Sequence, residues 1–170
     1  MDIVMLILRL IHIGTAVFWG GTAFFLVSFL TPAVQAAGPE GGKVMQRLAL
    51  SSFPKVLPGI GSLTVLSGLA MYWHDSAGFQ LNWITTPTGL GFSFGALMGL
   101  TSLLIGLFVT IPAINRLGSI AREAMASGEP PSPEQMKEIP GLQVKMTSAA
   151  LWNAIFLALA VAGMATARYL

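Results

Sequence analysis

Two histidines and a neighbouring thioether are the side chains of this sequence that could bind a metal or a cofactor. His12 and His74 are the only histidines, and each lies in or beside a long apolar run. Imidazole is a ligand for haem iron and for copper, and the soft sulfur of Met71, one helical turn before His74, favours Cu(I). The absence of cysteine excludes disulfides, thiolate metal sites and iron–sulfur clusters. The candidate cofactors are therefore haem b or copper, and the alternative is that both histidines are structural and bind none.

Two arginines are expected at the same end of the bundle as these histidines, and they could belong to the same site. Arg9 comes one turn before His12, and Arg168 closes the last apolar run. Ionisable residues inside membrane segments are functional candidates by default, because burying one unpaired is costly. Both arginines could meet the propionates of a haem, or they could extend their charges to the membrane surface. No side chain is assigned a catalytic role, so the sequence leaves open whether the chain is an enzyme.

The elements that carry these residues are predicted to be membrane helices. The chain has 170 residues, of which 54% are hydrophobic and only 9% are charged, whereas soluble proteins carry about 25% charged residues. Four apolar runs, 3–30, 53–73, 90–114 and 146–169, reach or exceed the roughly 20 residues that a spanning helix needs. We expect one all-α membrane domain over 1–170, an up-down four-helix bundle whose main partner is the lipid bilayer. A net charge of +2 gives no indication of nucleic acid binding.

The basic residues predict the orientation of this bundle. Residues 31–52 and 115–145 are the expected loops at one end, and Lys and Arg concentrate in or beside them, whereas residues 74–89 have neither. The basic residues in or beside these loops are Lys43, Arg47, Lys55, Arg116, Arg122, Lys137 and Lys145. By the positive-inside rule both loops are cytoplasmic, and both termini face the outer, periplasmic side of a multi-pass inner membrane protein.

Counting along the helices places the two histidines at one depth. His12 lies roughly 28 Å from Thr31 and His74 roughly 30 Å from Pro54, at 1.5 Å per residue. If the first two helices leave the membrane at those residues, both histidines reach its outer boundary together. This matched level is the main reason to expect one shared site.

The loops contain further helical signals. Residues 31–52 predict a Gly/Pro break, a short interfacial helix and a restart at Pro54. In the other loop, Ser132 is a suitable N-cap and Gln135 completes a capping box. Pro140 and Gly141 are expected to end that short helix.

Small residues at four-residue spacing predict where helices approach each other closely. Gly91, Gly95 and Gly99 form one such stripe. It could pack the bundle internally, form a homodimer interface, or leave room for a flat cofactor. Asn153, close to the alanine stripe of the last helix, is expected to form an interhelical hydrogen bond.

The first two helices also resemble a known group of membrane proteins. "LRLIHIGTAVFWGGTAFFLVSFLTPAV" resembles the first helix of copper resistance D (CopD)-type proteins, with a histidine followed by a Trp-Gly-Gly element. "FPKVLPGIGSLTVLSGLAMYW" is similar to their second helix. The related HemJ-type protoporphyrinogen oxidases share the four-helix theme and bind haem b. The resemblance implies that His12 is the group's helix-one histidine. The lysine that the HemJ pattern places within a later helix has no counterpart inside 90–114 or 146–169.

Three classes of function are compatible with this sequence. The first is a haem b-binding redox or haem-handling protein, in which His12, His74, Arg9 and Arg168 contact the cofactor. The second is a copper-handling or transport protein of the CopD type, in which His12, His74 and Met71 are the ligands. The third is a non-catalytic accessory subunit of a larger membrane complex.

Overall fold

The computed structural model describes residues 2–170, and within this range the chain is almost entirely helical, without a strand. Four helical spans in the described range are long and apolar enough to cross a membrane: Ile3–Ala36, Phe53–Asp75, Pro87–Ser127 and Pro133–Tyr169. The predicted all-α four-helix membrane bundle is therefore confirmed.

These spans are divided into shorter elements by turns and changes in helix type. In chain order the elements are α1 (Ile3–Phe25), the π-helical turn η1 (Leu26–Leu30), α2 (Thr31–Ala36), α3 (Gly38–Leu50), α4 (Phe53–Asp75), α5 (Leu81–Ile84), α6 (Pro87–Ile105), the π-helical turn η2 (Gly106–Thr110), α7 (Ile111–Ser127), α8 (Pro133–Thr166) and the 3-10 turn η3 (Ala167–Tyr169). The predicted short helix between the first two spans is present as α3, and α4 begins at Phe53, beside the predicted restart at Pro54.

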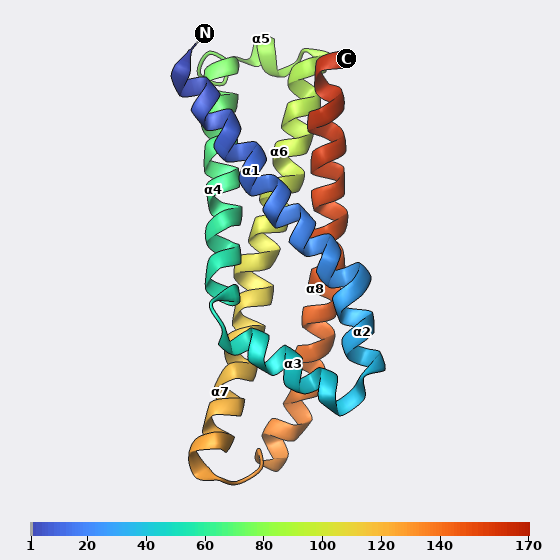
Figure 1. The fold of residues 1–170 in the computed structure, drawn as a ribbon. Coiled ribbons are helices and arrows are strands. Elements are labelled where there is room, and N and C mark those ends of the chain that lie inside the picture. The colour runs from blue at the N-terminus through green and yellow to red at the C-terminus, as the bar shows by residue number, and fades with distance from the viewer. Residues whose placement is uncertain (1) are drawn as a thin grey trace.

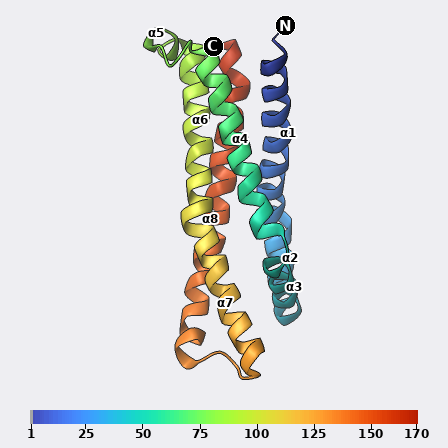
Figure 2. The same ribbon diagram turned by 90° about the vertical axis from the view of Figure 1, so that its left-hand side faces the viewer.

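The long helices lie along one axis, and α1 crosses the others obliquely. Figure 1 shows α1 passing from beside α4 at one end of the molecule to beside α8 towards the other. Figure 2 shows α1 on one side of the bundle and α6 on the other. The start of α1, the short helix α5 and the C-terminus share one end, called here the terminal end. The connection between α7 and α8 forms the opposite end, called the hairpin end.

Several helices are longer than the sequence predicted. The first span continues to Ala36, and α7 with α8 makes most of 115–145 helical, so only residues 128–132 connect them. The prediction that Pro140 and Gly141 end a short helix is wrong, because α8 runs through both. The predicted capping box is confirmed: the Ser132 hydroxyl accepts from the Gln135 backbone N–H, and the Gln135 side chain accepts from the Ser132 N–H.

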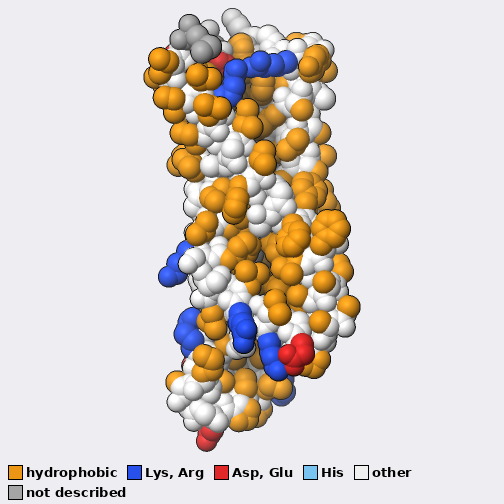
Figure 3. All heavy atoms as spheres, in the orientation of Figure 1, with side chains coloured by type: hydrophobic (Ala, Val, Ile, Leu, Met, Phe, Trp, Pro, Cys, Tyr) orange, Lys and Arg blue, Asp and Glu red, His pale blue; other side chains and the backbone are white. Residues whose placement is uncertain are grey.

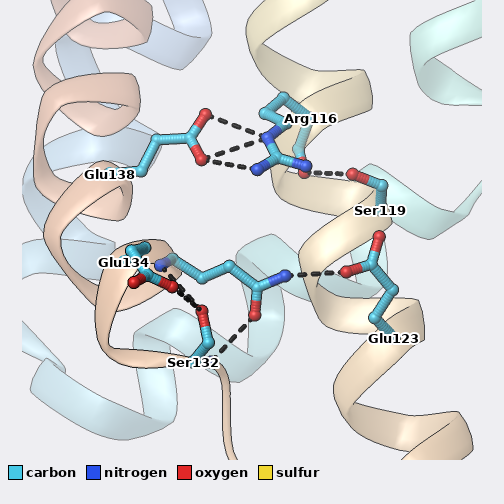
Figure 4. Close-up of polar contacts among 7 residues, drawn as sticks. Arg116, Ser119, Glu123, Ser132, Glu134 and Glu138 are labelled. Carbon is cyan, nitrogen blue, oxygen red and sulfur yellow. Dashed lines mark hydrogen bonds and ion pairs between the residues drawn. The ribbon is translucent and has the colours of Figure 1, made fainter.

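Contacts between α7 and α8 hold the first turns of α8, which runs on through Pro140. A proline inside a helix costs about 3 kcal/mol through a lost hydrogen bond and a steric clash. Figure 4 shows Arg116 of α7 facing Glu138 of α8, and its Nε and Nη2 donate to that carboxylate at 2.9 and 2.7 Å. The Gln135 amide also donates to Glu123 at 2.7 Å. These links hold the first turns of α8 against α7.

Two prolines explain the two π-helical turns. The Thr31 N–H donates to the Leu26 carbonyl, and the Ile111 N–H donates to the Gly106 carbonyl, five residues back in each case. Each turn is followed after one residue by a proline, Pro32 or Pro112. A proline cannot donate to the carbonyl four residues before it, and its ring crowds that carbonyl. Widening the preceding turn relieves the clash without ending the helix.

The glycine stripe of α6 packs inside the bundle. A Cβ atom at Gly95 would lie 2.6 Å from Met164 Cγ, and one at Gly91 would lie 2.9 Å from Ala167 Cβ. Gly99, in contrast, has open space around it. Of the roles that the sequence leaves open for Gly91, Gly95 and Gly99, internal packing is therefore the one found at the first two positions, because α8 and η3 cover them. Close approach through small residues is how membrane helices associate when lipid removes the hydrophobic driving force.

A buried hydrogen bond joins the same two helices. The Ser102 hydroxyl donates to Asn153 Oδ1 at 3.0 Å, and Ser102 is fully buried. The predicted interhelical hydrogen bond of Asn153 is thus confirmed, and its partner is identified.

Removing either partner of this bond is expected to destabilise the bundle modestly. Interhelical hydrogen bonds in membranes contribute about 0.6 to 2 kcal/mol. Ser102→Ala and Asn153→Ala should each cost about 1 kcal/mol, and the double variant should cost clearly less than the sum, because both remove one interaction. Unfolding in mixed detergent measures the free energies. Strict additivity would show that the two residues stabilise the fold independently.

Candidate functional site

His12 of α1 faces α4 and is held by its backbone. Its Nδ1 lies 2.8 Å from the Thr64 carbonyl oxygen. A carbonyl can only accept, so Nδ1 carries the proton and donates it. In the neutral ring this leaves Nε2 unprotonated, with its lone pair available. The side chain is half-buried, so the ring has both a fixed orientation and access to its surroundings.

Glycines on α4 make room for the two large rings of α1. A Cβ atom at Gly68 would lie 2.7 Å from His12 Cε1, and one at Gly61 would lie 3.1 Å from Trp19 Cε2. His12 and Trp19 are seven residues apart on α1, as Gly61 and Gly68 are on α4. Two turns of one helix therefore match two turns of its antiparallel neighbour, with a ring over a glycine at each level. Together with Thr15 and Thr64 these residues form the α1–α4 seam.

Hydroxyl groups fill the space between these two levels. The Thr64 hydroxyl donates to Thr15 Oγ1 at 2.8 Å, and the Thr15 hydroxyl is also 2.7 Å from the Ile11 carbonyl. The Ser67 hydroxyl lies 3.0 Å from the Thr64 carbonyl, the same oxygen that accepts from His12. This carbonyl therefore serves two side-chain donors, and the hydroxyls fix its position as well as that of the ring.

The second imidazole nitrogen of His12 remains unpaired by the protein. Nε2 has no hydrogen-bond partner among residues 2–170. Nε2 is also not fully buried, because every fully buried side-chain nitrogen or oxygen in this range has a hydrogen-bond partner. The seam thus holds one imidazole nitrogen with an oriented, unpaired lone pair in a membrane span.

His74 is not part of this arrangement. It lies at the end of α4, exposed, with Nε2 3.8 Å from Asp2 Oδ2 and Nδ1 3.4 Å from Asp75 Oδ1. The His12 ring lies against Gly68, and His74 follows Gly68 by six residues on the same helix. At 1.5 Å per residue the two histidines are about 9 Å apart along the bundle. The expectation that they share one level is wrong.

The reason lies in how the first span runs. The count along the sequence assumed that Thr31 and Pro54 are level with each other. The helix instead continues through η1 to Ala36, α3 then intervenes before α4, and α1 crosses α4 obliquely. Each of these features shifts His12 away from the terminal end relative to His74.

The other predicted site residues lie nearer the terminal end. Met71 is half-buried and follows Gly68 by three residues, about 4.5 Å along α4. Arg9 precedes His12 by the same interval, and Arg168 lies in η3; both are exposed. Basic side chains lie across this part of the surface in Figure 3. The structure therefore places Arg9 and Met71 within a turn of His12's level, and separates His74 from it.

The side chains that commonly bind metal ions in proteins are those of histidine, cysteine, aspartate and glutamate. Among residues 2–170, no group of three or more histidines and carboxylates could hold a metal ion.

Sequence reasoning missed the residues that orient His12. Thr64, Gly68 and Thr15 were not identified as site residues, although a signal for them exists. The seven-residue spacing of His12 and Trp19 is repeated by Gly61 and Gly68. That match predicts ring-over-glycine packing once the two helices are known to be antiparallel neighbours.

Comparison of the chain with protein families, with characterised proteins and with solved structures finds no match.

Proposed function

We propose that this multi-pass membrane protein binds haem b through Nε2 of His12 and acts as a redox or haem-handling protein. The observation that carries the proposal is the hydrogen bond from His12 Nδ1 to the Thr64 carbonyl, which leaves Nε2 unpaired and not fully buried. Metal-binding histidines commonly donate their other ring N–H to a backbone carbonyl, which fixes the ring and raises the basicity of the ligating nitrogen. An ionisable side chain in a membrane span is also a functional candidate in its own right.

The residues fit a haem with one protein ligand. Haem supplies one-electron chemistry at its iron, whose potential the axial ligand adjusts. The chain contributes one imidazole, and Arg9, about 4.5 Å further towards the terminal end, is a counter-charge for a propionate. Arg168 offers a second charge at that end. Ligation by both histidines is not proposed, because His74 lies about 9 Å further along the bundle and faces the carboxylates of Asp2 and Asp75.

Copper is less well supported. Both ring nitrogens of His74 face carboxylates, those of Asp2 and Asp75. His12 and Met71 are then the remaining pair of suitable donors, and the sulfur lies one turn away along α4. A low-coordinate Cu(I) ion could use such a pair of ligands.

The charge distribution supports the proposed location. Seven of the nine Lys and Arg residues lie towards the hairpin end, and only Arg9 and Arg168 lie towards the terminal end. By the positive-inside rule the hairpin end is cytoplasmic in a cell inner membrane, and the His12 site is nearer the outer face.

The visible absorption spectrum of detergent-purified protein tests this function. We expect a Soret band, saturation near one haem per chain on titration with haem b, and a five-coordinate spectrum. Failure to bind haem at this stoichiometry would refute the proposal. Copper in elemental analysis of colourless protein would favour the CopD-type alternative. Neither cofactor, together with co-purification of a larger complex, would favour the accessory subunit.

A further inference from the structure

A groove on the lipid-facing surface lies between α8 and the segment formed by α6, η2 and α7. It consists of two adjoining hollows of about 310 Å³ each, which share Val109 and Lys145 in their walls. One hollow also includes Arg116, at the side of the hairpin end. The other includes Ile105, Ser148 and Trp152, nearer the middle of the bundle. The groove therefore changes from basic to apolar along its length.

The position of Lys145 along α8 matches the depth of lipid headgroups. Lys145 and Arg168 are 23 residues apart, about 34 Å in a helix. The hydrocarbon core of a bilayer is about 30 Å thick. With Arg168 at one boundary, Lys145 lies at the other, and Trp152 lies about 10 Å inside it.

Lys145 is the unpaired charge of this groove. It is exposed, and among residues 2–170 no carboxylate lies within ion-pair distance of it. Arg116 is already neutralised by Glu138, as Figure 4 shows. The groove thus carries one net positive charge at headgroup depth, and the hydroxyl of Ser148 lies one turn further in.

We propose that this groove binds one phospholipid with a net negative headgroup. Lys145 pairs with the phosphate, and one acyl chain lies along Ile105, Val109 and Trp152. A basic pocket between membrane helices on the cytoplasmic side is the arrangement that anionic lipids recognise. A helix of another protein would be a poorer occupant, because it would bury the Lys145 ammonium without a partner. The proposal is independent of the haem site.

Native mass spectrometry of the detergent-solubilised full chain tests this site. The probes are phosphatidylglycerol and phosphatidylcholine of the same acyl composition, added at equal concentration. We expect wild-type protein to retain one phosphatidylglycerol in preference to phosphatidylcholine. A lysine near the membrane surface contributes about 1 kcal/mol to attraction of an anionic lipid, so Lys145→Gln should lower this preference about fivefold.

Lys137→Gln is the matched control. It removes the same charge from the same helix, eight residues nearer the hairpin end and outside the groove. The control should keep the wild-type preference. The proposal is overturned if both lipids bind wild-type protein equally, if Lys145→Gln binds like wild type, or if the two variants lose the preference to the same extent.

Discussion

Replacement of His12 by alanine is expected to abolish haem binding. The substitution removes the proposed ligand nitrogen of the α1–α4 seam. Loss of a residue that only orients a metal ligand lowers metal affinity by up to about 100-fold, so loss of the ligand itself should lower haem affinity by more than that. The helix itself should persist, because alanine is a strong helix former and the half-buried ring contributes little to the core. The Soret absorbance after titration with haem measures the loss, and circular dichroism reports whether the bundle remains folded.

His74→Ala is the matched control for that experiment. It removes the chain's other imidazole, from an exposed position beside Asp2. The structure predicts unchanged haem content and an unchanged spectrum for this variant. If His12→Ala keeps the wild-type spectrum, His12 is not the ligand. If His74→Ala instead loses the cofactor, the ligand is at the terminal end and the seam has another role.

Introducing leucine at Gly95 is expected to disrupt the bundle. The first added carbon would already lie 2.6 Å from Met164 Cγ and 3.1 Å from the Ala160 carbonyl oxygen. Backbone atoms cannot yield as a flexible side chain can, so α6 and α8 must separate. Overpacking of this kind costs about 1–3 kcal/mol, which for a chain of this size lowers Tm by about 2–12 °C. Thermal unfolding in detergent measures the shift.

Gly99→Leu provides the comparison one turn along the same helix. A Cβ atom there meets nothing within 4 Å, so its Tm should equal that of wild type. Size-exclusion chromatography distinguishes the alternative role of the stripe. If Gly95→Leu keeps its Tm and elutes as a smaller particle than wild type, the stripe joins two copies and internal packing by α8 is refuted.

The sequence by itself determined the membrane architecture. A spanning helix must satisfy its backbone hydrogen bonds internally and expose apolar side chains to lipid, so run length and composition suffice to identify the four spans. Local signals were equally decisive at Ser132 and Gln135, because a capping box involves residues three positions apart. Asn153 was predictable as an interhelical donor or acceptor, since a polar side chain in lipid needs a partner.

Only the tertiary structure decided which residues meet. The first span continues through η1 to Ala36, α3 intervenes before α4, and α1 crosses α4 obliquely, so depths counted in residues from a loop do not transfer between these helices. This separated His74 from His12 and brought the Thr64 carbonyl to the ring instead. It also assigned Gly91 and Gly95 to the packing of α8. Such contacts depend on the relative rotation, tilt and offset of two helices, and the pattern within one helix carries no information about these quantities.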